Sequence, residues 1–317
     1  MSAFQYTIRV HTDHHRVQTF VIGKGLYPSR IFLPQGYSAA EHELFSPVVC
    51  VHGGGLLVNN SPLDDPLARH LADASRSMVV SIDYRKAPQN KFPSAYEDVV
   101  EQILAVIDDS TLPLDHKNIV LCGRFVGGNL VLAAAQNPQI RDRLTGVIAV
   151  YPICDLVPSF GEDMASRPGL SVPDFLGSTY PGISDLCLGQ NANVELTDVR
   201  LSLTHFKSRG HLPQNVLMVA CEHDLLRREA EVMAERIATL EGSSKAATNH
   251  SWRAGCIEWY SPLPQPAFEV SPAKTPEKEA ARKAVFVGGS SDGICSSDGI
   301  WRWQSTQCLL VIGFRVF

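Results

Sequence analysis

The chain alternates short apolar runs, rich in β-branched residues, with longer segments in which apolar residues recur every three or four positions. The short runs predict strands and the longer segments predict amphipathic helices. Leu71 in one segment, and Val99, Ile103 and Val106 in the next, follow the helical spacing. Strands are predicted over 4–10, 17–22, 29–33, 48–51, 78–82, 119–122, 147–151 and 216–220, and helices over 62–75, 93–108, 127–136 and 226–240.

This order of elements is typical of a mostly parallel central sheet flanked by helices. The first strands follow one another without an intervening helix, which favours an antiparallel hairpin at the sheet edge. Residues 152–213 interrupt the alternation because they are rich in Pro, Gly and Ser and only intermittently apolar. A bare loop of that length is uncommon in a compact domain. We therefore expect a cap insertion over the carboxyl ends of the strands, where open α/β sheets bind ligands.

Composition narrows the class of protein. The 317 residues are 44% hydrophobic and 19% charged, which allows a large core and excludes bulk disorder. The net charge of −5 gives no electrostatic reason to expect nucleic acid or an anionic membrane as partner. No run of 18 apolar residues predicts a membrane span. The polar N-terminus predicts no secretory signal, and the last three residues are no peroxisomal address, so we expect a cytoplasmic protein.

The cysteines and histidines predict neither a metal site nor a cofactor. None of the eight cysteines forms a C-x-x-C pair, and Cys50, Cys122 and Cys221 lie in apolar, strand-like runs. Such cysteines are expected to be buried free thiols, in keeping with a reducing compartment. The eleven histidines show no H-E-x-x-H or other zinc-ligand spacing.

The first motif with chemical meaning is His52-Gly53-Gly54-Gly55, directly after a predicted strand. Consecutive glycines leave backbone N–H groups unobstructed, so they can face negative charge that develops on a substrate oxygen. A triple glycine alone is often only a tight turn. Its place after a buried strand and a histidine favours an oxyanion hole.

The second motif points to a family. Residues 83–89 (DYRKAPQ) and 92–98 (FPSAYED) resemble the YRLAPE…FPAAxED run of hormone-sensitive-lipase-type carboxylesterases in the α/β-hydrolase superfamily. This resemblance implies an α/β-hydrolase fold and a small-molecule substrate. The segment is then expected to pack a strand end and begin a helix, with Pro93 in its first turn. The matching residues are Tyr84, Arg85, Ala87, Pro88, Phe92, Pro93, Ala95, Glu97 and Asp98.

The third motif, residues 122–130 (CGRFVGGNL), resembles the family's GDSAGGN nucleophile elbow. Phe125 stands at the position of the nucleophilic serine, Arg124 replaces the preceding acid, and Val126 is implied as a further oxyanion donor. Phenylalanine has no lone pair with which to attack a carbonyl, so no acyl-enzyme is expected at this elbow. Removing a triad nucleophile typically costs on the order of 10⁶ in turnover.

The remaining triad positions are followed in the same way. Residues 221–229 resemble the family's DPLRDE segment, which makes Asp224 the triad acid that orients an imidazole. Residues 255–259 are similar to the family's G-x-x-H-G loop, with Glu258 where the histidine stands. His250 is nearby, but its flanking residues do not match that loop, and a surface-loop histidine is the expected role.

Three functions stay open on these observations. The first is a non-hydrolytic enzyme of a fungal specialised-metabolite or toxin pathway, as the resemblance suggests. It would act on a small ester, thioester or carbonyl compound, with Phe125 as an apolar floor and Glu258 as a general acid or base. The second is a receptor-like module that binds a small acid without turnover. The third is an inactive, degenerate copy, and an alternative role for Glu258 is a solvated surface carboxylate.

The resemblance covers residues 27–286, so we expect an α/β-hydrolase-like domain over 1–286 and an atypical tail over 287–317. Residues 271–286 resemble the family's last helix. In the tail, residues 290–294 (SSDGI) recur as residues 296–300, and the segment resembles translated non-coding or rearranged sequence. The alternative is a genuine C-terminal strand over 308–312, which would be an aggregation hazard if exposed.

Overall fold

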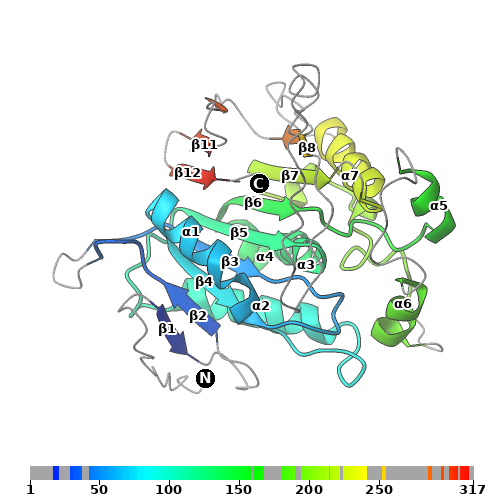
Figure 1. Cartoon of the computed structure of the whole chain (residues 1–317), viewed down its shortest axis with the longest axis horizontal. Coiled ribbons are helices and arrows are strands. Elements are labelled where there is room, and N and C mark those ends of the chain that lie inside the picture. The colour runs from blue at the N-terminus through cyan, green and yellow to red at the C-terminus, as the bar shows by residue number, and fades with distance from the viewer. Residues whose placement is uncertain are drawn as a thin grey trace, which may run out of the picture.

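The protein is described by a computed structural model, in which a nine-stranded sheet forms the centre (Figure 1). The described residues are 17–20, 29–37, 43–158, 160–167, 180–189, 194–213, 215–221, 224–240, 252–254, 285–287, 294–295, 300–305 and 308–313. The strands are ordered β1-β2-β4-β3-β5-β6-β7-β8, and β9 also pairs with β7. Their bounds are β1 Val17–Phe20, β2 Ser29–Phe32, β3 Pro47–Val51, β4 Met78–Ile82, β5 Ile119–Arg124, β6 Leu144–Val150, β7 Asn215–Cys221, β8 Trp252–Ala254 and β9 Val285–Val287.

The sheet is parallel from β4 to β8 and antiparallel at β1, β2 and β9. The edge hairpin predicted from the sequence is confirmed, because β1 pairs antiparallel with β2 at the end of the sheet. The predicted strand over 4–10 lies outside the described residues.

Helices cover both faces of the sheet. The apolar residues of α2 (Ser94–Asp108), α3 (Val126–Ala135) and α7 (Arg227–Thr239) pack on one face, and those of α1 (Asp65–Ser75) on the other. The short helix α4 (Pro138–Arg141) follows α3, and the 3₁₀ turn η2 (Ser61–Asp64) precedes α1. This three-layer arrangement confirms the expected class of fold.

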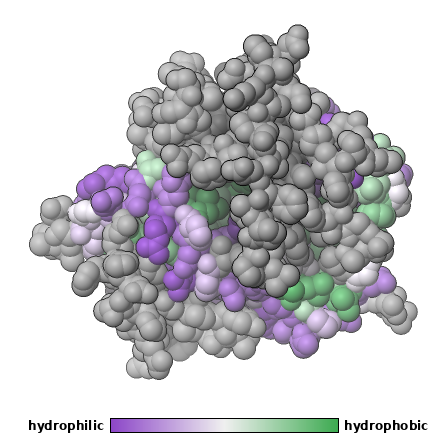
Figure 2. Space-filling view, in the orientation of Figure 1, coloured by the Kyte–Doolittle hydropathy of each residue, from purple (hydrophilic) through white to green (hydrophobic). Residues whose placement is uncertain are grey.

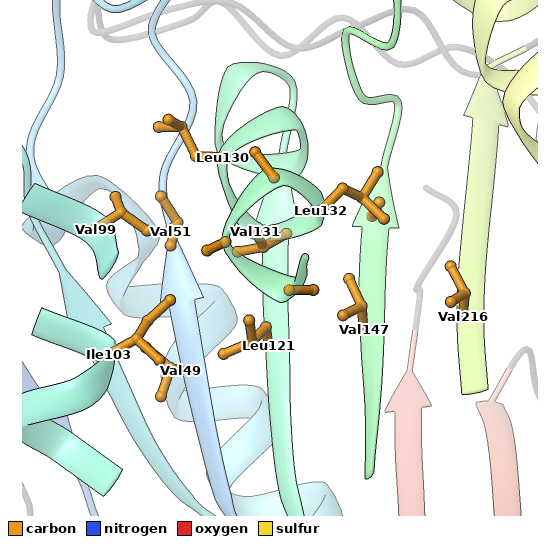
Figure 3. Packing of buried hydrophobic residues seen from close by; sticks show 14 of the residues in the cluster. Val49, Val51, Val99, Ile103, Leu121, Leu130, Val131, Leu132, Val147 and Val216 are labelled. Carbon is orange, nitrogen blue, oxygen red and sulfur yellow. The ribbon is translucent and has the colours of Figure 1, made fainter. Parts of the chain in front are cut away.

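Central strand β3 shows why the layers form. Val49 and Val51 belong to the core under α2 and α3, where Ile103 lies beside Val49 and Val99 beside Val51 (Figure 3). Val48 and Cys50 belong to the second core, beneath α1. Successive side chains of a strand point to opposite faces, so a strand covered on both faces is apolar throughout.

The helical spacing noted in the sequence is confirmed, since Leu71, Val99, Ile103 and Val106 are all buried. Several helix and strand ends in the structure differ by a residue or two from those predicted. Pro93 caps α2 and is not in its first turn, because its backbone is not yet helical. Strand β6 ends at Val150 and not at Tyr151, whose φ of 37° turns the chain out of the strand.

The segment predicted as a cap lies between β6 and β7. Its described part contains α5 (Phe160–Ala165), α6 (Tyr180–Leu188) and the 3₁₀ turns η4 (Leu203–His205) and η5 (Arg209–His211). The thiol of Cys187 on α6 donates to the carbonyl oxygen of Gly55, with 3.0 Å between sulfur and oxygen. The segment therefore reaches the glycine loop at the carboxyl ends of the strands.

The C-terminal part contains strands. The helix predicted over 271–286 is wrong at its last two residues, because Val285 and Phe286 belong to β9 and pair with β7; its other residues lie outside the described ranges. The strand considered as an alternative over 308–312 is present as β12 (Cys308–Gly313), which forms an antiparallel sheet with β11 (Ile300–Ser305) and β10 (Ile294–Cys295). The isoleucine of each repeat copy begins a strand of this sheet.

On the face shown in Figure 2, the described residues include small hydrophobic areas with hydrophilic residues beside them. In the described part of the chain, no helix is both long and apolar enough to span a bilayer. Among the residues with described side chains, the exposed large apolar ones are Leu44, Val58, Val157, Leu186 and Leu196.

Candidate functional site

The candidate site lies along one edge of the sheet. His52 follows β3, Phe125 follows β5, and Asp224 comes shortly after β7. These strands are parallel, so their carboxyl ends meet at the edge where α/β sheets bind ligands. The glycine loop and the elbow touch: a Cβ atom at Gly53 would lie 3.2 Å from Cβ of Phe125.

The backbone at Phe125 has the sharp turn of an elbow between strand and helix. Its φ of 54° and ψ of −121° are strained for a residue with a side chain, at a cost of about 1–3 kcal/mol. Its N–H donates to the carbonyl of Val150 (3.0 Å), and its carbonyl accepts from the N–H of Asn129 (3.2 Å). The side chain is 3% exposed and belongs to the core shared by α2, α3 and α7.

Glycines let the elbow close. A Cβ atom at Gly123 would overlap the carbonyl oxygen of Gly127, and one at Gly127 would overlap the carbonyl oxygen of Val51. The third, Gly128, lies against Pro152, which a side chain there would crowd. The glycine spacing of the motif is therefore required by close packing of strand, turn and helix.

Arg124 pairs with a carboxylate from another part of the chain. Its Nη2 donates to Oδ1 of Asp64, at the junction of η2 and α1. Asp64 is only 2% exposed, whereas a quarter of the Arg124 side chain is exposed. The cation that replaces the motif's usual acid is thus neutralised within the fold.

His52 is a buried structural residue. Its Nδ1 lies 2.5 Å from the carbonyl oxygen of Gly53, and its Nε2 lies 3.1 Å from Oδ1 of Asp83. The ring stacks on Tyr84 with centroids 4.6 Å apart, and the Tyr84 hydroxyl donates to the His52 carbonyl (3.1 Å). Burial lowers the pKa of His52, although the neighbouring carboxylate of Asp83 acts in the opposite direction.

Asp83 anchors the glycine loop. It lies beside His52, and it accepts from the backbone N–H groups of Ser61 (3.2 Å) and Tyr84 (2.7 Å) and from the ammonium of Lys86. Sequence reasoning quoted Asp83 and Lys86 within the second motif but gave them no role. The available signal was their place directly after a buried strand, beside a motif histidine.

The other two glycines of the loop adopt positive φ values, 131° at Gly54 and 60° at Gly55. The Gly54 carbonyl accepts from the N–H groups of Leu57 and Val58, both at 3.0 Å, and so closes a tight turn. A Cβ atom at Gly54 would overlap the Val58 carbonyl oxygen.

The second motif has the expected structural role. Arg85 forms an ion pair with Asp98 of α2, with 2.7 Å between Nη2 and Oδ1, and the Arg85 N–H donates to the same carboxylate (2.8 Å). The pair ties the end of β4 to the start of α2. Tyr84 is buried against His52.

Asp224 lies in an acidic part of the site. It is 4% exposed, and its Oδ1 accepts from the N–H of Leu226 (3.0 Å). Glu229 on α7 accepts from the N–H groups of Cys154 (2.7 Å) and Asp155. Burial raises the pKa of Glu229 well above its usual value, and the charge of Asp224 adds to the effect. Burial likewise raises the pKa of Asp163 on α5 to about 6.

Two of the predicted positions cannot be placed. Glu258 and His250 lie outside the described residues, although β8, which ends at Ala254, lies beside β7. Cys50 and Cys122 are buried free thiols, as predicted, and the side chain of Cys221 is outside the described part. Among the described side chains, no group of three or more His, Cys, Asp or Glu residues could hold a metal ion.

Comparison with known proteins assigns the family. The family model for the alpha/beta hydrolase fold matches residues 48–260, which include the glycine loop, the elbow and Asp224. This chain therefore belongs to the α/β-hydrolase fold family, in its hormone-sensitive-lipase-type branch.

Among its relatives is a versiconal hemiacetal acetate esterase of Emericella nidulans, 26% identical over 281 residues, which are 86% of this chain and 88% of that protein. An arylesterase of Saccharolobus solfataricus is 30% identical over 63% of this chain and 65% of its own length. An AB hydrolase superfamily protein of Schizosaccharomyces pombe is 31% identical, but the chain spans only 38% of it.

Solved structures give the same fold. The metagenomic carboxylesterase EstE1 superposes with a TM-score of 0.64 at 25% identity, covering 80% of this chain and 82% of its own. The hyperthermophilic esterase of Pyrobaculum calidifontis superposes with a TM-score of 0.61 at 26% identity over 77% of each chain. The chain is thus an esterase-like α/β hydrolase by fold and by relatives.

Proposed function

We propose that this protein binds a small ester, thioester or carbonyl compound of a specialised-metabolite pathway, and acts on it without forming an acyl-serine. The observation that supports this most directly is Phe125 at the elbow. The sharp turn, the close-packed glycines and the adjacent loop resemble the family's elbow, yet the side chain is an apolar ring buried in the core. A hydrocarbon ring cannot be a nucleophile.

Without a nucleophilic side chain at the elbow, backbone N–H groups are the donors that would polarise a carbonyl of the ligand. The Gly53 carbonyl contacts the His52 ring, and across a trans peptide the N–H of Gly54 points the opposite way. Helix α3 begins at Val126, and the first N–H groups of a helix have no intrahelical acceptor. These donors, with those of Gly53 and Gly55, would stabilise negative charge on a carbonyl oxygen.

The class of ligand is supported by the relatives. Proteins named versiconal hemiacetal acetate esterase, from Emericella nidulans and Dothistroma septosporum, are among them, so a hemiacetal ester is a reasonable first ligand to test. In this proposal Asp224 keeps the triad-acid position and Glu258 is the general acid or base that replaces the imidazole.

The test compares four proteins: wild type, Phe125→Ser, Phe125→Ala, and Phe125→Ser combined with Glu258→His. Each is treated with a fluorophosphonate probe and with p-nitrophenyl acetate. We expect neither labelling nor rapid turnover for wild type and Phe125→Ala. Labelling is expected to appear with Phe125→Ser, and hydrolysis to increase further in the double variant. Stoichiometric labelling and rapid turnover by the wild type would overturn the proposal.

Ligand binding is measured separately. Titration calorimetry with a panel of small acetate esters and ketones should show saturable binding by the wild type. Conversion of the bound compound, followed by mass spectrometry, distinguishes an enzyme from a receptor-like module. The absence of saturable binding across the panel would favour the degenerate copy.

A further inference from the structure

Lys86 carries a positive charge into the buried cluster beneath the glycine loop, at the position where the resembling family run has leucine. Its side chain is 11% exposed. The ammonium contacts Oδ1 of Asp83 and the carbonyl oxygen of Tyr84, and lies 3.4 Å from Nε2 of His52. It also lies 3.9 Å from the centre of the Tyr84 ring. An ammonium has three donors, and each of them faces an acceptor here.

These contacts restrict the protonation of His52. Nδ1 lies 2.5 Å from the Gly53 carbonyl oxygen, which can only accept, so Nδ1 carries a hydrogen. Nε2 then has two states. Without a hydrogen it accepts from Lys86, and with one it donates to Asp83, 3.1 Å away. The two states differ by one proton, and Lys86 is an acceptable partner only for the neutral ring.

Charge favours the neutral ring. The carboxylate of Asp83 and the ammonium of Lys86 cancel, so a second proton on His52 would leave a net positive charge in a fully buried place. The charged groups that act on this cluster are Asp83 and Lys86 themselves and, from α2, Asp98, which attracts the Lys86 ammonium. The partners of Asp83 from η2 and from the residue that follows it, Ser61 and Tyr84, are uncharged N–H groups.

We propose that Lys86 is a positioning residue: it keeps His52 as the neutral ring with the hydrogen on Nδ1. In this state no net charge is buried beneath the glycine loop, Nδ1 donates to the Gly53 carbonyl, and across the trans peptide the N–H of Gly54 points the opposite way. The use of this N–H for a ligand rests on the proposed function, whereas the state of His52 can be measured without any ligand.

The experiment is nitrogen NMR of protein labelled with ¹⁵N-histidine, recorded between pH 5.5 and 8. The His52 signals are assigned from the spectrum of His52→Gln. In the wild type we expect one protonated Nδ1 and one unprotonated Nε2 throughout this range. In Lys86→Met, which keeps the length of the side chain without its charge, we expect His52 to gain a second proton within it.

Lys86→Arg is the matched control. It keeps the positive charge, so His52 should stay neutral, and this variant remains informative if Lys86→Met does not fold. An imidazolium signal for His52 in the wild type at pH 7, or the same titration in Lys86→Met as in the wild type, would overturn the proposal. Either result would leave the test with the fluorophosphonate probe unaffected.

Discussion

The guanidinium of Arg124 and the carboxylate of Asp64 form an ion pair between the end of β5 and the start of α1. The two residues lie 60 positions apart in the chain. Asp64 is buried, so its charge depends on a nearby cation. The arginine at the elbow is therefore part of the folded structure, with a partner supplied by a different strand-to-helix connection.

Breaking this pair should destabilise the protein. Loss of one partner of a fully buried pair costs about 3–5 kcal/mol, and because Arg124 is a quarter exposed we expect about 2–3 kcal/mol for Arg124→Met. Urea unfolding of Arg124→Met, Asp64→Asn and the double variant gives the coupling energy. The double variant should lose clearly less than the sum of the singles. Simple additivity would show that the pair contributes nothing.

The strained backbone at Phe125 gives a second prediction. Glycine is ordinarily less stable than alanine by about 0.5–1 kcal/mol within a folded element, but at a φ of 54° the order should reverse. We expect Phe125→Gly to be more stable than Phe125→Ala by about 1 kcal/mol. Phe206, buried with an ordinary φ of −63°, is the matched control, where alanine should be the more stable. If glycine and alanine ranked in the same order of stability at positions 125 and 206, the strain argument would be contradicted.

Close packing of the elbow predicts a contrast between glycines. Gly123→Ala places a Cβ atom onto the Gly127 carbonyl, and we expect a loss of more than about 2 kcal/mol or failure to accumulate as folded protein. Gly182 on α6 is exposed, and a Cβ atom there meets nothing within 4 Å. Gly182→Ala should be neutral or stabilising by up to about 1 kcal/mol. Thermal and urea unfolding of both variants would reveal whether they differ.

Asp163 predicts a pH dependence of stability. Its pKa is raised from 3.8 to about 6, so between these values the folded state holds a proton that the unfolded state has lost. Stability contributed by this proton is present below pH 4 and is lost as the pH rises through 6. Asp163→Asn should thus be more stable than the wild type at pH 7.5, by at most about 3 kcal/mol, and not at pH 4. If urea unfolding gave the same difference in unfolding free energy between wild type and Asp163→Asn at pH 4 and pH 7.5, the raised pKa would be contradicted.

Part of the site could be predicted from the sequence alone. Gly53 and Phe125 follow two apolar runs that become neighbouring parallel strands, so their motifs had to meet at one edge of the sheet. Two contacts could not be predicted from the sequence, that of Arg124 with Asp64 and that of His52 with Lys86. They depend on which side chains the folded loops bring together. Strand β9 could not be predicted either, because its three residues are too few to show an alternating pattern and its partner β7 is distant in the sequence.

The positive φ at Phe125 has a consequence for what a single substitution there could do. The backbone already holds the turn on which a nucleophilic serine is presented, and the flanking glycines already make room for it. Every phenylalanine codon becomes a serine codon by a change at its second base. The chain therefore stands a single point mutation from a hydroxyl at the elbow, with no rearrangement of the main chain.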